Sequence, residues 1–201
     1  MKSDPAKNSV AGIVLAAGGA SRFGEPKQLL LWHGRALVWH VADKAVEAGL
    51  SPVIVVGGDY MESLRSSLAG LAVSLIHNPH WKQGQSTSVR AGVGAVPASG
   101  MGAMLLLADQ PQIPVTLIRK LMQIHASDGA PIVAPRVQNQ RANPVLFDRV
   151  VFDDLMKLSG DIGGRKLFSK YKPEWVTWHD TSILLDVDTR EDYRELLDLD
   201  E

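Results

Sequence analysis

The sequence predicts an α/β protein, a three-layer domain in which helices cover both faces of a mostly parallel β-sheet. Short β-branched apolar runs alternate along the chain with longer segments of helical periodicity. Several runs are apolar throughout, which is typical of strands buried on both faces. With 201 residues the chain can bury a large core. We expect one domain over residues 10–201, preceded by a flexible tail over residues 1–9.

The composition excludes several classes of function. The net charge is −1, from 21 basic and 22 acidic side chains, so no overall basic field attracts nucleic acid. Cysteine is absent, which excludes disulfides and thiolate metal sites and fits a reducing compartment. No apolar run approaches the ~18 residues of a membrane span, and the polar start lacks a secretory signal. We expect a cytoplasmic protein without nucleic-acid or membrane partners.

The first predicted strand ends in a glycine-rich loop, IVLAAGGASRFGEPK. Gly18 and Gly19 follow the apolar run, and the loop then supplies Arg22 and Lys27. Backbone N–H groups beside two fixed cations suit a polyphosphate. The spacing fits neither a Walker A loop nor the G-x-G-x-x-G dinucleotide fingerprint. The alternative is an ordinary strand-to-loop turn with surface cations.

The first half of the chain continues the alternation. Turn residues and changes of periodicity bound the predicted elements. In order we expect a helix over 36–48 ended by Gly49, a strand over 53–56, a helix over 60–68 capped by Asp59, a strand over 73–76, a helix over 85–96, a strand over 103–107 and a helix over 115–126.

The second half is less regular, but strand and helix patterns persist. We expect strands over 131–134 and 144–147 around a polar loop at 136–141, a helix over 150–158, a glycine-rich turn at 160–165 opening a short helix, strands over 175–178 and 183–187, and a last helix capped by Thr189.

Acidic residues follow two of the predicted strands, at the sheet edge where ligands of such folds bind. Asp109 comes directly after a buried strand, and a carboxylate there suits Mg²⁺ together with substrate phosphates. Asp186 and Asp188 alternate along a predicted strand, so they face opposite sides, and Asp188 is the expected metal ligand. The alternatives are a turn residue for Asp109 and a helix cap for Asp188.

Two further segments leave their roles open. Residues 84–90 place hydroxyls at a predicted helix start, which suits a phosphate, a ribose or a base edge, or else plain N-capping. Residues 160–165 are either an anion-binding glycine turn or a helix start. The histidines show no metal-ligand spacing, and the tryptophans are expected to pack in the core or at an interface. A serine hydrolase is unsupported because G-x-S-x-G is absent.

Residues 15–27 carry a family resemblance. They read LAAGGASRFGEPK, close to the motif L-A-A-G-x-S-x-R-M-G-x-x-K, with Ala20 and Phe23 as mild departures. The chain resembles the MobA-like nucleotidyltransferase family over roughly residues 10–197, and within it the MocA-type molybdenum cofactor cytidylyltransferases. Later matches are residues 77–79, 84–90, 109–111, 143–147, 159–165 and 186–189.

The resemblance implies a Rossmann-like nucleotidyltransferase fold and Mg²⁺-dependent transfer of CMP from CTP to the phosphate of molybdopterin. Pyrophosphate would be released, and a molybdoenzyme would receive the product. The implied catalytic residues are Arg22, Lys27 and Asp109, and the implied Mg²⁺ ligands are Asp109 and Asp188. The implied nucleotide-binding residues are Leu15, Ala16, Ala17, Gly18, Gly19, Arg22, Lys27, Gly57 and Ser88. Asn143, Pro144, Asp161 and Arg165 would bind the acceptor.

Within that resemblance the donor base and the acceptor rest on different segments. Ala16-Ala17-Gly18 is similar to cytidylyltransferases, because guanylyltransferases usually show Ala-Gly-Gly there. The acceptor is less defined, since Ala142-Asn143-Pro144 stands where MocA-type proteins often carry Gly-His-Pro. The alternatives are another NTP, another phosphorylated acceptor such as a sugar phosphate or methylerythritol phosphate, or a non-enzymatic chaperone for a molybdoenzyme.

Overall fold

The computed structural model describes residues 9–18 and 25–199. Its main sheet has eight strands, seven of which follow the order β10-β7-β9-β6-β1-β4-β5, while β8 pairs with β7 at the side. The bounds are β1 Val10–Ala16, β4 Val53–Gly57, β5 Val73–His77, β6 Gly102–Leu107, β7 Ile132–Val137, β8 Gln140–Arg141, β9 Val145–Asp148 and β10 Glu174–Thr177. A separate hairpin pairs β2 Leu31–Trp32 with β3 Arg35–Ala36.

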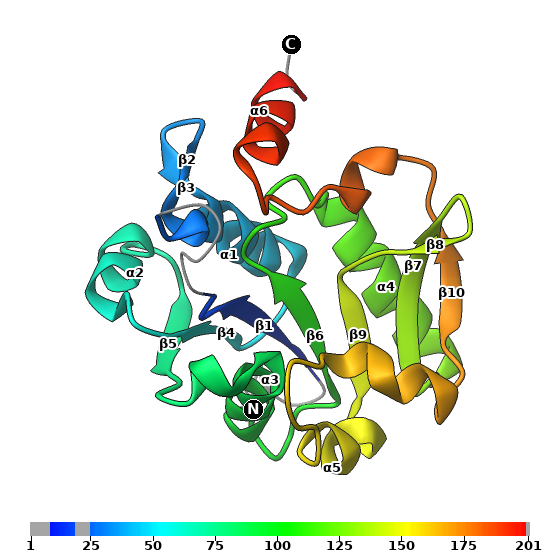
Figure 1. The fold of residues 1–201 in the computed structure, drawn as a ribbon. Helices are drawn as coiled ribbons and strands as arrows, with labels where there is room; N and C mark the ends of the chain where they lie inside the picture. The colour runs from blue at the N-terminus through cyan, green and yellow to red at the C-terminus, as the bar shows by residue number, and fades with distance from the viewer. Residues whose placement is uncertain (1–8, 19–24, 200–201) are drawn as a thin grey trace, which may run out of the picture.

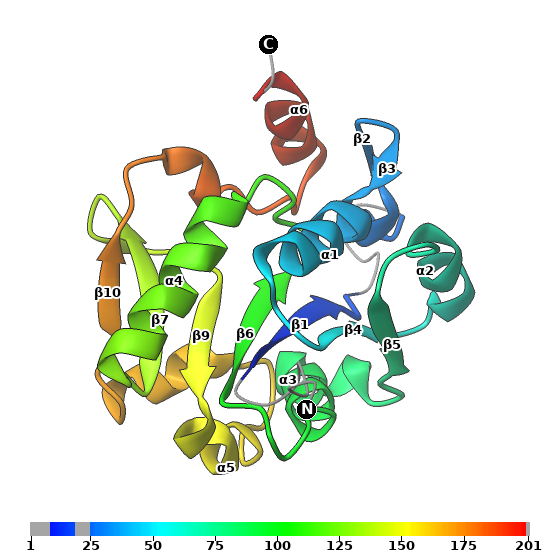
Figure 2. The same ribbon diagram turned by 180° about the vertical axis from the view of Figure 1, so that it is seen from behind.

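Helices cover both faces of this sheet. The described helices are α1 Leu37–Ala48, α2 Met61–Ser67, α3 Gln85–Gly94, α4 Val115–Asp128, α5 Phe152–Leu155 and α6 Arg190–Asp198. Helices α3 and α5 lie on the face seen in Figure 1, and α1 and α4 lie on the face seen in Figure 2. The predicted three-layer α/β architecture is therefore confirmed.

Strand β1 shows why the sheet must be covered twice. Its buried side chains alternate between two cores, because successive residues of a strand point to opposite faces. Val10 and Val14 pack in the core under α1 and α4, whereas Ala11 and Ile13 pack in the core under α3 and α5. All four are buried, as the apolar run predicts.

The direction of β9 departs from the parallel arrangement. Strands β5, β4, β1 and β6 run parallel to one another, but β9 runs antiparallel to β6, with Leu105 opposite Val145. The start of β9 therefore lies at the same sheet edge as the ends of β1 and β6.

The helix ends largely follow the predicted signals. Gly49 ends α1 in the left-handed conformation (φ 93°), and Thr189 begins α6 with a capping box. The predicted capping role of Asp59 is wrong, because α2 begins after Tyr60 without a side-chain cap. The Asp59 carboxylate instead accepts a hydrogen bond from Trp81 Nε1 at 2.9 Å.

Two other segments differ from the sequence prediction. Residues 136–141 form the β7–β8 hairpin rather than a polar loop, because Gln138 and Asn139 both adopt positive φ and turn the chain in two residues. The predicted strand over 183–187 is a 3₁₀ turn, Thr181–Leu184, followed by extended chain. Ile183 and Val187 are buried in different clusters, so no single sheet face holds both.

Two further expectations concern the chain start and membranes. Residues 1–8 of the predicted tail lie outside the described residues. Ser9 donates a hydrogen bond to the carbonyl oxygen of Ser51 and accepts one from the N–H of Met101. None of the helices within 9–18 and 25–199 is long and apolar enough to cross a membrane.

Candidate functional site

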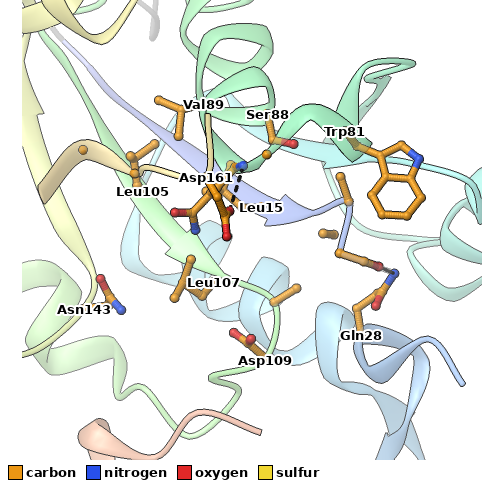
Figure 3. A pocket seen from close by; sticks show the side chains of 18 of the residues that line it. Leu15, Gln28, Trp81, Ser88, Val89, Leu105, Leu107, Asp109, Asn143 and Asp161 are labelled. Atoms are coloured by element: carbon orange, nitrogen blue, oxygen red, sulfur yellow. Dashed lines mark hydrogen bonds between the residues drawn. The ribbon is translucent and has the colours of Figure 1, made fainter. Parts of the chain in front are cut away.

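A cavity of about 840 Å³ opens where β1 and β6 end and β9 begins. Its volume suits a nucleotide together with part of a second substrate. Trp81 and Gln28 lie at one end and Asn143 at the other, with Leu15 and Leu107 between them (Figure 3). From the predicted set it gathers Leu15, Ala16, Ala17, Gly18, Lys27, Ser88, Asp109, Asn143, Asp161, Arg165 and Asp188.

Lys27 is held between two carboxylates in this cavity. Its Nζ donates to Asp109 Oδ2 and to Asp188 Oδ1, each at 2.5 Å. The sequence separations are 82 and 161 residues, so only the folded sheet edge joins them. Burial by itself lowers the pKa of Lys27, but the two carboxylates outweigh burial and raise that pKa above its usual value. Lys27 is therefore a fixed positive charge at neutral pH.

Asp186 lines the cavity as well as Asp188, so the prediction that the two residues face opposite sides is wrong. The alternation argument failed because these residues do not lie in a strand. Burial, followed by the negative charges of Asp109 and Asp188, raises the pKa of Asp186 to about 6. Its Oδ1 accepts a hydrogen bond from Gln110 Nε2 at 2.5 Å.

The carboxylates fit a divalent cation that arrives with a substrate. Asp109 and Asp188 contact the Lys27 ammonium group, Asp186 lines the same cavity, and the buried Asp109 Oδ1 has no hydrogen-bond partner within the described part of the chain. Over the same residues, no three His, Asp or Glu side chains form a ready-made metal site. Mg²⁺ usually takes only one or two carboxylates and completes its shell with water and phosphate oxygens. Asp109 and Asp188 suit that role.

The segment that carries Asp186 and Asp188 is docked on the loop after β6. Gln112 Nε2 donates to the carbonyl oxygens of Ser182 and Leu185 at 3.0 and 2.7 Å. The backbone N–H of Val187 donates to the carbonyl oxygen of Asp109 at 3.1 Å. The sequence prediction did not assign a role to Gln110 or Gln112, although their place beside Asp109 in the segment Asp-Gln-Pro-Gln was a usable signal.

The Trp81 end of the cavity is built by close backbone contacts. Gln28 Nε2 donates to the carbonyl oxygen of Gly18 at 3.1 Å. A Cβ on Gly58 would lie 2.9 Å from both the carbonyl oxygen of Ala17 and the Trp81 ring, so only glycine fits there. Trp81 lines the cavity, which corrects the expectation that every tryptophan serves only packing.

Three residues of the predicted nucleotide-binding set are not among those that the structure places at the cavity. Gly57 does not line the cavity; a Cβ on it would meet Met61 and Leu64 of α2. Gly19 and Arg22 lie outside the described residues, and their roles stay predictions.

The start of α3 is closed by protein contacts rather than left open. Asp161 Oδ1 accepts from the N–H of Gln85 at 3.3 Å, and the carbonyl oxygen of Gly160 accepts from the N–H of Ser86 at 3.3 Å. Asp161 thus caps this helix in addition to lining the cavity. The serines do not cap it, since Ser86 Oγ is buried without a partner in the described chain and Ser88 Oγ accepts from Asn78.

The Asn143 end depends on a glycine-rich loop packed against β9 and α3. A Cβ on Gly164 would lie 2.3 Å from Phe147, and one on Gly163 would lie 2.5 Å from Gln85. The same loop carries Arg165, which lines the cavity. Asn143 lines the cavity, whereas Pro144 does not.

Comparisons with known proteins agree with this geometry. Residues 12–175 match the MobA-like NTP transferase domain. The chain is 30% identical to nicotine blue oxidoreductase of Paenarthrobacter nicotinovorans, covering 94% of this chain and 96% of that protein. It is 27% identical to molybdenum cofactor cytidylyltransferase of Escherichia coli K12, covering 90% of this chain and 92% of that protein.

Solved structures share the fold. The crystal structure of Rv0371c from Mycobacterium tuberculosis H37Rv matches with a TM-score of 0.85 and 29% identity, covering 95% of this chain and 98% of that one. A complex of Rv0371c with manganese matches with a TM-score of 0.81 and 28% identity, covering 96% and 100%. Because the family domain spans most of the sequence and the relatives match over nearly their whole length, the chain belongs to the MobA-like NTP transferase family of nucleotidyltransferases.

Proposed function

We propose that the protein transfers CMP from CTP to the terminal phosphate of molybdopterin and releases pyrophosphate. One observation carries the proposal: Lys27 is fixed between Asp109 and Asp188 in a cavity that also reaches Trp81 and Asn143. With a volume of about 840 Å³, the cavity has room for a donor nucleotide and part of an acceptor beside this cluster.

The reaction needs positioning and charge neutralisation more than acid–base chemistry. An acceptor phosphate oxygen bonds to the α-phosphorus of the donor, and the bond from that phosphorus to the bridging oxygen breaks to free pyrophosphate. The attacking oxygen is already anionic, so no side chain has to remove a proton. Lys27 supplies a fixed positive charge to the phosphates, and Arg22 is proposed to supply another.

A divalent cation completes the charge balance in this proposal. Mg²⁺ held by Asp109 and Asp188 would neutralise phosphate charge. The manganese complex of Rv0371c supports a divalent cation in this fold. Asp186 and Gln110 keep the carboxylate-bearing segment in place beside that position.

The donor and acceptor identities rest on separate support. For CTP the support is the Ala16-Ala17-Gly18 segment, which lines the cavity, and the similarity to the E. coli cytidylyltransferase. For molybdopterin it is the same relative, together with Asn143 and Arg165 at the acceptor end. Delivery of the product to a molybdoenzyme and a cytoplasmic location complete the proposal.

Measuring the release of pyrophosphate tests the proposed transfer reaction directly. Purified protein with Mg²⁺ is incubated with each of the four NTPs, with and without molybdopterin. Release with CTP only when molybdopterin is present is the expected result. Release with GTP instead would reassign the donor, and CTP binding without turnover would favour a carrier role.

A second candidate activity is oxidation or reduction of a compound such as nicotine blue. The similarity to nicotine blue oxidoreductase over nearly the whole chain favours it. Oxidation of NADH or NADPH, followed by absorbance with a heteroaromatic dye as acceptor, measures it. Dye-dependent oxidation without any nucleotidyl transfer would replace the first proposal with this one.

A further inference from the structure

Asn78 lies just after β5 and is almost completely buried, with 3% of its surface exposed. Its side chain has an unambiguous orientation. The backbone N–H of His80 donates to Asn78 Oδ1 at 3.0 Å, and a backbone N–H can only donate. This contact assigns the oxygen of the amide, so the opposite atom is the Nδ2 donor.

The two Nδ2 hydrogens point at two hydroxyls of α3. Nδ2 donates to Thr87 Oγ1 at 2.8 Å and to Ser88 Oγ at 2.9 Å. The Thr87 hydroxyl donates its own hydrogen to backbone carbonyls, because its Oγ1 lies 2.9 Å from the carbonyl oxygen of Gly84 and 3.1 Å from that of His80. Each donor and acceptor of this small network therefore has a fixed direction.

Ser88 ends the network at the cavity. Its oxygen accepts from Asn78, and no acceptor for its hydroxyl hydrogen occurs among residues 9–18 and 25–199. Ser88 lines the cavity between Val89 and Trp81 (Figure 3). Its hydrogen is thus available to whatever binds there.

We propose that Asn78 is a positioning residue that fixes Ser88 as a hydrogen-bond donor to an oxygen of the bound nucleotide. The inference rests on the proposed function only in taking the ligand to be a nucleotide. Nucleotides present acceptor oxygens on their phosphates, their ribose and the pyrimidine carbonyl. Asn78 already uses one of the two lone pairs on the serine oxygen, whereas the hydroxyl hydrogen has no acceptor in the described chain, so a ligand acceptor oxygen is the group that completes this position.

One substitution distinguishes this positioning role of Asn78 from a purely structural role in the turn. The His80 contact is an Asx-type turn that uses only Oδ1, and aspartate can make it equally well. The contact to Ser88 needs the amide hydrogens, which an ionised aspartate lacks. Asn78→Asp therefore keeps the turn while forcing Ser88 to donate to residue 78 and away from the ligand.

The test is a double-mutant cycle of wild type, Asn78→Asp, Ser88→Ala and the double variant. The affinity for CTP with Mg²⁺ is measured by calorimetry at about pH 8, where an aspartate is ionised. We expect each single variant to raise the dissociation constant about tenfold to hundredfold, and the double variant to bind like Ser88→Ala within about twofold.

Asn78→Ala serves as a second variant where the aspartate prevents folding, which thermal unfolding reports. It should weaken CTP binding about threefold to tenfold when Ser88 is present, and not at all when it is combined with Ser88→Ala. Equal losses with and without the serine would overturn the inference, because they would show that Asn78 acts through the local fold and not through Ser88.

The outcomes separate the inference from the proposed function. Wild type that binds CTP while Asn78→Asp keeps full affinity would overturn the inference alone. Wild type that binds none of the four NTPs would overturn the proposed function and this inference with it.

Discussion

The two halves of the main sheet contribute to the cavity in opposite ways. On one side, β5, β4, β1 and β6 run parallel, and their carboxyl ends supply Ala16–Gly18 and Asp109. On the other side, β9 runs antiparallel to β6, so it reaches the same edge with its first residues and delivers Asn143. The cavity is therefore lined by strand ends at one end and by a strand start at the other.

This difference separates two kinds of chemistry. The parallel half holds the dense charge, because Lys27 and Asp109 are mostly buried and tightly paired, with side-chain exposures of 21% and 16%. The antiparallel half contributes a neutral amide and the exposed Arg165 on a glycine-rich loop. We expect substitutions in the first half to affect catalysis and those in the second to affect acceptor binding.

The largest effect is expected at Lys27. Lys27→Ala removes the ammonium group between the two carboxylates and should lower kcat about a hundredfold to thousandfold, as loss of a preorganised charge does. Pyrophosphate release measures it, and thermal unfolding shows that the fold persists. Lys120→Ala, which removes an exposed cation on α4, is the matched control. Near-normal turnover would remove Lys27 from the mechanism.

Asp109→Asn should give the next largest effect. The substitution keeps the side-chain shape but removes charge, so activity should fall about a hundredfold at fixed Mg²⁺ and recover in part as Mg²⁺ is raised. A Mg²⁺ titration of the initial rate measures the change. An unaltered Mg²⁺ dependence would show that the cation is held elsewhere.

Arg165→Ala tests the antiparallel half of the comparison. Loss of a partly solvated cation should raise the KM for the phosphorylated acceptor about tenfold. The affinity for CTP should stay within about twofold. Lys166→Ala removes a neighbouring exposed charge outside the cavity and is the control. An equal loss of CTP affinity would erase the division between the two halves.

The smallest effect concerns the pH dependence of stability. The folded pKa of Asp186 is about 6, above its ordinary 3.8, so the folded state holds this proton more tightly than the unfolded state does. Its contribution to stability falls as pH rises from about 4 to about 6. Asp186→Asn should remove this loss and gain about 1 kcal/mol above pH 6, a figure reduced for solvent screening. Urea unfolding at several pH values measures it, and a gain that does not depend on pH would contradict it.

The predicted elements were most reliable where local chemistry decides structure. The apolar runs of β1, β4 and β6 predict strands because no other arrangement buries such segments on both faces. Gly49 and Thr189 predict helix ends because each satisfies terminal backbone groups locally. The predicted strand over 183–187 failed because the side chains of Gln110 and Gln112 hold this segment in place of pairing with a neighbouring strand, which its local apolar pattern does not show.

The candidate site divides in the same way. The glycine loop with Lys27, and Asp109, could be selected from the sequence because each follows a buried strand, and the carboxyl ends of such strands form the ligand-binding edge. Asp186, Trp81 and the donor direction of Asn78 could not be assigned, since each depends on a contact between segments that local patterns do not relate.

The sequence by itself determined the fold class, the parallel strands and the family, because periodicity and motif spacing are local properties. The tertiary structure alone decided that Lys27 lies between Asp109 and Asp188, that Asp186 faces the cavity, and that β9 presents its start to the site. The physical reason is that strand direction and loop docking depend on which distant surfaces bury one another, and that choice is made only when the whole chain packs.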